Sequence, residues 1–181
     1  MIRDDQHVVL VGLMGTGKST VARAIGERLG RPVVDTDAVV EQRAGRSVRE
    51  LFVEVGESAF RDLESDVLRD ALASPTPSVI AAAGGVVVRE ANRDLLRSSG
   101  ARVVWLCADP DTLVERVLGA GHRPLLDADP AGTLQRMAEQ REPWYRQVAD
   151  AIVLVDHRSV GEVVEADRKS TRLNSSHGYI S

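Results

Sequence analysis

The glycine-rich stretch GLMGTGKST, residues 12–20, constrains the fold of this chain more than any other feature. It follows the apolar run 8–11 and precedes the amphipathic segment 18–29, an order that predicts a strand, a tight loop and a helix. Four positions match the pattern G-x-x-x-x-G-K-[ST]: Gly12, Gly17, Lys18 and Ser19. Glycines let backbone N–H groups turn inward around a phosphate, and the helix N-terminus adds partial positive charge. The stretch therefore predicts a nucleotide site, with Lys18 on the outer phosphates and Ser19 on Mg²⁺; the alternative is a turn that only links strand to helix.

Short β-branched runs alternate with longer amphipathic stretches along the rest of the chain. The expected strands are 7–11, 32–35, 78–82, 102–106 and 151–155. The expected helices are 18–29, 47–52, 58–73, 90–98, 111–118 and 130–148. Because most of the strands are apolar on both faces, the pattern predicts an α/β fold with a five-stranded parallel sheet covered by helices.

The length of the chain, 181 residues, fits one domain with a real core, which we expect over residues 1–166. Residues 38–73 hold two or three helices where a simple crossover needs one, so we expect an inserted helical subdomain over the carboxyl edge of the sheet. The segment 119–130 is rich in Gly, Pro and Asp, which is typical of a mobile loop. Periodicity then stops, and we expect residues 167–181 to be disordered or non-native.

Composition excludes several classes of protein. Hydrophobic residues make up 43% and charged residues 28%, as in ordinary globular proteins, and no apolar run approaches the roughly 20 residues of a membrane helix. A formal net charge of -4 gives no general attraction to nucleic acid. We therefore expect a cytoplasmic protein with no nucleic-acid or membrane partner, and a monomer because no heptad run is present. The single cysteine, Cys107, is expected to be a small buried hydrophobe.

Candidate residues for a second ligand follow the second and third strands. Asp35 and Asp37 are two apart, so in an extended chain both would face the same side, where they would serve Mg²⁺ and an acceptor hydroxyl; a helix N-cap explains one of them equally well. Arg61 and Glu64 are three apart on a predicted helix. They form either a pair that presents Arg61 to a carboxylate or phosphate, or a solvated surface pair. The glycines at 84–85 permit close backbone approach or mark a turn.

Six segments together resemble the shikimate kinase family over a span from about Val8 to Val164. They are GLMGTGKST, DTD, FRDLE, AGG, HRPLL and QREPWY, and their order and spacing make the resemblance specific. It implies a P-loop kinase-type three-layer α/β/α fold. It also implies transfer of the γ-phosphoryl group of ATP to the 3-hydroxyl of shikimate, which gives shikimate 3-phosphate and ADP on the route to chorismate and the aromatic amino acids.

The resemblance implies roles for individual residues. Those implied for ATP are Gly12, Met14, Gly15, Thr16, Gly17, Lys18, Ser19, Thr20, Arg116, Arg123 and Arg158. Those implied for shikimate are Asp37, Arg61, Gly84, Gly85 and Arg141. Those implied as catalytic are Lys18, Asp37 and Arg123, and those for Mg²⁺ are Ser19 and Asp35. Asp37 is placed to accept the hydroxyl proton, Arg61 and Arg141 grip the substrate carboxylate, and Arg123 comes from the 119–130 loop, which acts as a lid.

The chain departs from the family pattern at three places. Ala83 stands where the family usually has the first of three glycines. The third strand carries no acid, so a metal ion must rely on Ser19 and Asp35. The closing helix that the family has after Gly161 is expected to give way to the tail after about two turns.

Two other functions remain open from the sequence. One is a P-loop kinase for another small acceptor, such as gluconate or a nucleoside monophosphate. The other is a nucleotide-dependent binding switch that hardly turns over. Asp37, Arg61 and Arg141 speak against the switch, because a switch has no use for a pocket built around a small hydroxy acid.

Overall fold

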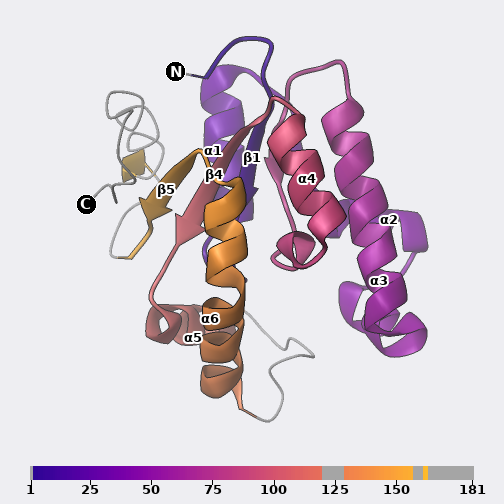
Figure 1. Cartoon of the computed structure of the whole chain (residues 1–181), viewed down its shortest axis with the longest axis vertical. Coiled ribbons are helices and arrows are strands. Elements are labelled where there is room, and N and C mark those ends of the chain that lie inside the picture. The colour runs from indigo at the N-terminus through magenta and orange to yellow at the C-terminus, as the bar shows by residue number, and fades with distance from the viewer. Residues whose placement is uncertain (1, 120–128, 157–160, 163–181) are drawn as a thin grey trace.

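The computed structural model describes residues 2–119, 129–156 and 161–162. Its elements in chain order are β1 (Val8–Val11), α1 (Lys18–Leu29), β2 (Val33–Asp35), α2 (Thr36–Ala44), α3 (Val48–Ala73), β3 (Val79–Ala81), the 3₁₀ helix η1 (Val86–Val88), α4 (Glu90–Ser98), β4 (Arg102–Cys107), α5 (Pro110–Gly119), α6 (Pro130–Val148) and β5 (Ala151–Leu154). The strands form one sheet in the order β2-β3-β1-β4-β5, and every neighbouring pair is parallel. The predicted five-stranded parallel α/β fold is confirmed (Figure 1).

Helices cover both faces of the sheet, which makes three layers (Figure 1). On one face α1 contributes Val21 and Ile25 to a core with β1, β3, β4 and β5. On the other face α3, α4 and α6 contribute Leu68, Leu96 and Leu134 to the larger core. β1 lies between its neighbours and is buried on both sides, which explains its continuous apolar sequence. Within the described ranges, no helix has the length and apolar character that a membrane span requires.

The observed elements agree closely with the predicted ones outside residues 36–58. Three helices have the predicted bounds: 18–29, 90–98 and 130–148. Each strand ends within one residue of its predicted limits. The predicted helices 47–52 and 58–73 are joined in α3, which is interrupted at Gly56, where φ is 77°. Neither α2 nor η1 was predicted as a separate element; α2 was covered only by the expectation of two or three helices in 38–73.

The helices α2 and α3 lie between β2 and β3 in the chain and pack on each other at one side of the sheet (Figure 1). They enclose a small core of their own, formed by Val40, Leu51, Phe60 and Val67. A capping box starts α3: the Ser47 hydroxyl accepts from the Glu50 N–H at 3.2 Å, and the Glu50 carboxylate accepts from the Ser47 N–H at 2.8 Å. The Val48 N–H also donates to the Glu41 carboxylate of α2 at 2.8 Å, which joins the start of α3 to α2.

Several predicted features fall outside the described residues. The loop 119–130 is described only where α5 ends at Gly119 and where Asp129 caps α6 through the Gly132 N–H. Residues 120–128, the tail 167–181 and all but the first two residues of the expected closing helix are not described.

Cys107 is half-buried at the end of β4, where it packs against the larger core. Burial raises the pKa of its thiol to about 11, and the carboxylates of Glu142 and Asp156 act in the same direction. The thiol therefore stays protonated at neutral pH, in keeping with the expected packing role.

The loop between β1 and α1 uses glycine for two separate reasons. Gly12 has φ 144° and Gly17 has φ 84°, and L side chains rarely adopt either conformation. A Cβ on Gly12 would also collide with the Leu106 carbonyl oxygen at the end of β4, whereas a Cβ on Gly17 would meet nothing within 4 Å. Gly12 thus lets the loop lie directly against β4, and Gly17 only permits the turn into α1.

Alanine substitutions at Gly12 and Gly17 separate the effect of backbone conformation from the effect of close packing against β4. Gly17→Ala should lower the free energy of unfolding by about 1–2 kcal/mol, the cost of a left-handed alanine. Gly12→Ala should cost clearly more, because it adds an overlap with backbone that cannot move aside. Urea denaturation of both variants and the parent protein measures the difference. Equal losses in the two variants would contradict the close approach of Gly12 to β4.

Candidate active site

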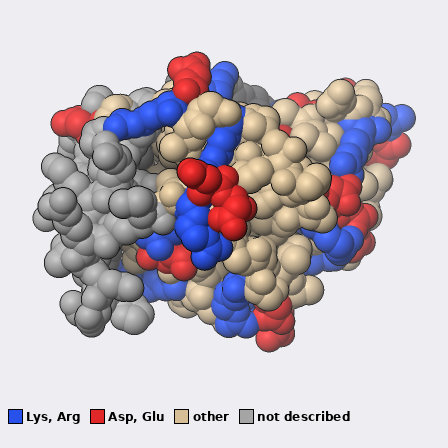
Figure 2. Space-filling model, turned by 90° about the horizontal axis from the view of Figure 1, so that it is seen from above, with Lys and Arg blue, Asp and Glu red and all other residues tan. Residues whose placement is uncertain are grey.

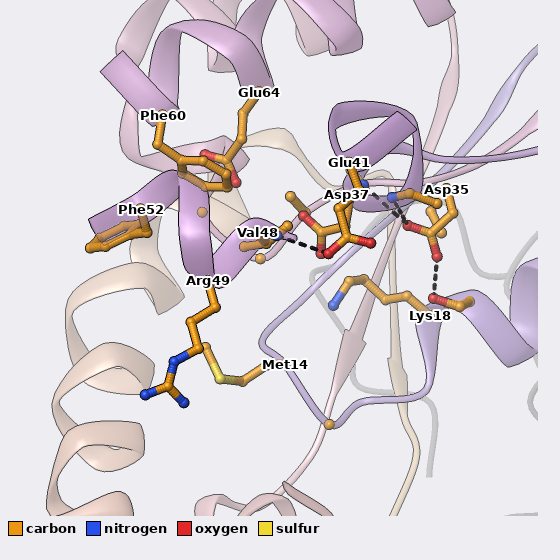
Figure 3. A pocket seen from close by; sticks show the side chains of 18 of the residues that line it. Met14, Lys18, Asp35, Asp37, Glu41, Val48, Arg49, Phe52, Phe60 and Glu64 are labelled. Carbon is orange, nitrogen blue, oxygen red and sulfur yellow. Dashed lines mark hydrogen bonds between the residues drawn. The ribbon is translucent and has the colours of Figure 1, made fainter. Parts of the chain in front are cut away.

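A cavity of about 710 Å³ opens at the carboxyl ends of β1, β2 and β3 (Figure 3). Most of the predicted site residues line it: Met14, Gly15, Gly17, Lys18, Ser19, Thr20, Asp35, Asp37, Arg61, Gly84, Gly85, Arg116 and Arg141. They come from the β1–α1 loop and the first turn of α1, the β2–α2 junction, α3, the segment after β3, α5 and α6. The structure therefore brings the predicted nucleotide residues and the predicted acceptor residues into one space.

Two predicted residues within the described ranges do not line this cavity. Gly12 and Thr16 belong to the loop beneath it: Thr16 is buried, and its hydroxyl donates to the Leu13 carbonyl at 2.8 Å. Arg123 and Arg158 lie outside the described residues. Arg116 does line the cavity, and its Nη2 donates to the Val155 carbonyl at 3.2 Å.

The β1–α1 loop has the chemistry of an anion site. The Lys18 ammonium donates to the carbonyl oxygens of Gly12 and Leu13, each at 2.8 Å, so it is held across the loop. No side chain caps the N-terminus of α1, where Gly17 occupies the cap position. The first N–H groups of the helix and the ammonium together favour a bound phosphate.

The β2–α2 junction corrects the expectation for the two aspartates. β2 ends at Asp35 and α2 begins at once, so Asp37 lies in the first helical turn and not in extended chain. Asp35 is the N-cap: its Oδ1 accepts from the N–H groups of Asp37 at 3.1 Å and Ala38 at 3.4 Å. Both carboxylates still line the cavity, on the same side as Lys18 in Figure 3.

Ser19 and Asp35 form a small oxygen cluster beside the loop. The Ser19 hydroxyl donates to Asp35 Oδ2 at 2.5 Å. Mg²⁺ commonly takes one or two protein oxygens and completes its shell with water and substrate phosphates, so this pair fits a nucleotide-bound Mg²⁺. The described residues contain no group of three or more His, Cys, Asp or Glu side chains that would hold a metal ion without such a partner.

Arg61 and Glu64 form a buried ion pair, so the surface-pair alternative is wrong. Their side chains are only 7% and 3% exposed, and Arg61 Nη1 lies 2.5 Å from Glu64 Oε2. Arg61 Nη2 also donates to Glu57 at 3.2 Å. Burial would lower the pKa of the Arg61 guanidinium, but Glu64 and Glu57 outweigh it and raise the pKa, so Arg61 keeps its charge. Burial raises the pKa of the Glu64 carboxyl, against the opposing effect of Arg61.

Arg141 joins Arg61 in the cavity wall from α6. It is 6% exposed, and its Nη1 donates to the Gly84 carbonyl at 3.2 Å. The Nε atoms of Arg61 and Arg141 are both buried with no hydrogen-bond acceptor in the described part of the chain. A buried donor without an acceptor costs about 1–3 kcal/mol. Two such guanidinium groups therefore favour an anionic ligand with planar oxygens, because guanidinium binds carboxylates in a forked geometry.

The segment after β3 explains how alanine replaces the first of the three glycines. The Ala83 N–H donates to the Thr36 hydroxyl at 2.9 Å, and both residues are buried. That N–H is therefore used inside the protein and is not offered to a ligand. At Gly85, in contrast, a Cβ would overlap the Arg61 guanidinium, so a larger residue there would displace that side chain from its present position.

Sequence reasoning missed part of the cavity wall. The residues concerned are Ala38, Glu41, Ser47, Val48, Arg49, Phe52, Phe60, Ala81 and Ala82. Phe52 and Phe60 lie across the cavity from Lys18 and Asp37 in Figure 3, with ring centroids 5.6 Å apart. In a helical pattern such rings are indistinguishable from core residues. The one available signal was that Phe60 adjoins Arg61 in the segment FRDLE.

Comparisons with known proteins agree with this geometry. A model of the shikimate kinase family matches residues 14–170. A shikimate kinase of Symbiobacterium thermophilum is 48% identical over 161 residues, which cover 87% of this chain and 91% of that protein. The structure matches a shikimate kinase from Acinetobacter baumannii in complex with shikimate with a TM-score of 0.87 and 29% identity, over 92% of this chain and 93% of that one.

A gluconokinase from Sinorhizobium meliloti 1021 matches less well, with a TM-score of 0.58 and 22% identity over 90% of this chain and 89% of that one. This likeness extends to the fold alone. The family model, in contrast, matches most of the chain, and the relatives of high identity carry the same family name. The chain belongs to the shikimate kinase family.

Proposed function

We propose that this protein transfers the γ-phosphoryl group of ATP to the 3-hydroxyl of shikimate, giving shikimate 3-phosphate and ADP for aromatic amino-acid biosynthesis. The observation that carries the proposal is that two buried arginines, Arg61 and Arg141, line one cavity with the phosphate loop. This arrangement suits a small carboxylate-bearing acceptor beside a nucleotide. The family of the chain supports the same reaction.

On the nucleotide side, catalysis rests on position and charge. Phosphoryl transfer needs little covalent help from a protein, because alignment and stabilisation of negative charge provide most of the acceleration. Lys18 supplies charge to the outer phosphates, and the N–H groups at the start of α1 orient them. Mg²⁺, when bound with ATP, neutralises phosphate charge, and Ser19 and Asp35 would hold it. We assign Arg123 to the same task from the proposed lid.

On the acceptor side, the charged and the apolar residues of the cavity wall bind different parts of the substrate. Arg61 and Arg141 bind the substrate carboxylate, and the apolar face of the ring packs against Phe52 and Phe60. Asp37 binds the ring hydroxyls and accepts the proton of the 3-hydroxyl. Asp37 is suited to this because its carboxylate lines the cavity beside Lys18 (Figure 3).

We also assign roles to other segments of the chain. Arg116 and Arg158 would flank the adenine of ATP. Residues 38–73 would form the substrate-binding subdomain and residues 119–130 the lid, all within one domain over 1–166. We also propose a cytoplasmic monomer without nucleic-acid or membrane partners. In support, the net charge is -4, and the described acidic and basic side chains are interspersed on the face seen in Figure 2.

A coupled ADP-release assay tests the function directly. ADP release in saturating ATP and Mg²⁺ should rise strongly when shikimate is added, and much less with gluconate at the same concentration. The reason is that the two arginines and Asp37 match a ring with a carboxylate and hydroxyls at fixed positions. Faster ADP release with gluconate than with shikimate would contradict shikimate as the substrate. ADP release that does not rise with any acceptor would favour a binding switch.

Two alanine variants test the division of labour between the two ends of the cavity. Lys18→Ala should lower kcat by at least about 100-fold with any acceptor, because it removes charge from the transferred phosphoryl group. Arg61→Ala should raise the KM for shikimate by about 10- to 100-fold, since it removes a charged hydrogen-bonding partner, and should leave the KM for ATP nearly unchanged.

Arg69→Ala is the matched control for Arg61→Ala. Arg69 lies on the same helix and also pairs three residues away, with Asp66, but its side chain is 61% exposed. Its loss should change neither KM by more than about twofold. An equal loss of ATP affinity in Lys18→Ala and Arg61→Ala would contradict the proposed division.

A further inference from the structure

Tyr145 is a buried polar residue to which neither the sequence nor the proposed chemistry gives a role. It lies on α6 with 1% of its surface exposed, and its hydroxyl donates to the Gly84 carbonyl at 2.6 Å. Its ring stacks on Trp105 of β4, with centroids 5.6 Å apart and planes 21° apart. Burial raises the pKa of the Tyr145 hydroxyl, so this group keeps its proton and acts as a donor.

The Gly84 carbonyl accepts a second hydrogen bond, from Arg141 at 3.2 Å. Both donors belong to α6, so this carbonyl is directed toward that helix. The peptide between Gly84 and Gly85 is trans, and in a trans peptide the C=O and N–H bonds point in opposite directions. The Gly85 N–H must therefore point away from the Tyr145 hydroxyl.

Gly85 is buried, lines the cavity and lies directly against the Arg61 guanidinium. Its N–H donates to no acceptor in the described part of the chain. Buried backbone N–H groups almost always have a partner, whether protein, water or ligand. The Gly85 N–H is therefore a further donor available to a ligand, next to Arg61.

We infer that Tyr145 is a positioning residue for the substrate carboxylate: by holding the Gly84 carbonyl toward α6, it fixes the orientation of the N–H of Gly85, a residue of the cavity wall beside Arg61. The inference rests on the proposed function, since it names shikimate as the ligand. Arg141 alone would hold the peptide less firmly, because its bond to Gly84 is longer and its guanidinium also faces the ligand. Tyr145 touches neither substrate nor nucleotide and acts only through this peptide.

Tyr145→Phe tests the inference, because phenylalanine keeps the stacking on Trp105 and removes only the donor. The KM for shikimate should rise about three- to tenfold, the usual effect of one lost hydrogen bond, while kcat and the KM for ATP stay within about twofold. Ser78→Ala is the control. Ser78 is buried and bonds to His7 at 3.0 Å at the amino ends of the strands, away from the cavity. Its loss should lower the melting temperature and leave both KM values unchanged.

The inference would be wrong if both variants had a lower melting temperature but Tyr145→Phe had an unchanged KM for shikimate. Tyr145 would then be purely structural. An equal rise in the KM for shikimate and the KM for ATP in Tyr145→Phe would also contradict the inference.

A measurement on the unaltered protein covers the case in which Tyr145→Phe does not fold. In a ¹H–¹⁵N spectrum, the Gly85 amide resonance should shift downfield when shikimate is added, as expected for a new hydrogen bond to a carboxylate. If the protein phosphorylates shikimate but this resonance does not move, the inference is wrong and the proposed function stands. If the protein does not phosphorylate shikimate, both are wrong.

Discussion

The buried ion pair between Arg61 and Glu64 is the interaction on which the rest of the site depends. Removing one partner from such a pair typically costs about 3–5 kcal/mol, because the other charge is left buried. Glu64 therefore keeps Arg61 charged inside the protein. The pair does not use all of the donors of Arg61, and the Nε atoms of Arg61 and of the neighbouring Arg141 have no acceptor among the described residues. The fold thus holds two charged guanidinium groups in the cavity wall, where a carboxylate ligand would find them already in place.

Short polar contacts connect this charge to the sheet. The Thr36 hydroxyl joins the end of β2 to the end of β3 through the Ala83 N–H. The Gly84 carbonyl then joins the end of β3 to α6 through Tyr145 and Arg141. Three elements that are distant in sequence are therefore fixed at the sheet edge that also carries the phosphate loop. Rigid placement of this kind is what a reaction governed by alignment requires.

Features carried by local patterns were predictable, and features set by distant contacts were not. The phosphate loop and its flanking strand and helix follow from glycine spacing and hydrophobic periodicity. Asp35 and Asp37 were predicted to lie in extended chain, with a helix N-cap open for one of them, and α2 was therefore missed as a separate element. The spacing of Arg61 and Glu64 predicted their pairing but not its burial, which depends on packing around them. Tyr145 was missed because its partner, Gly84, lies 61 residues earlier in the chain.

The central claim is that the two buried arginines hold the carboxylate of shikimate opposite the terminal phosphate of ATP. The most direct measurement is a crystal structure of the protein with shikimate and a nonhydrolysable ATP analogue. We expect the carboxylate within hydrogen-bonding distance of Arg61 and Arg141, and the 3-hydroxyl between Asp37 and the γ-phosphate. Shikimate bound outside this cavity, or bound with its carboxylate away from both arginines, would contradict the account.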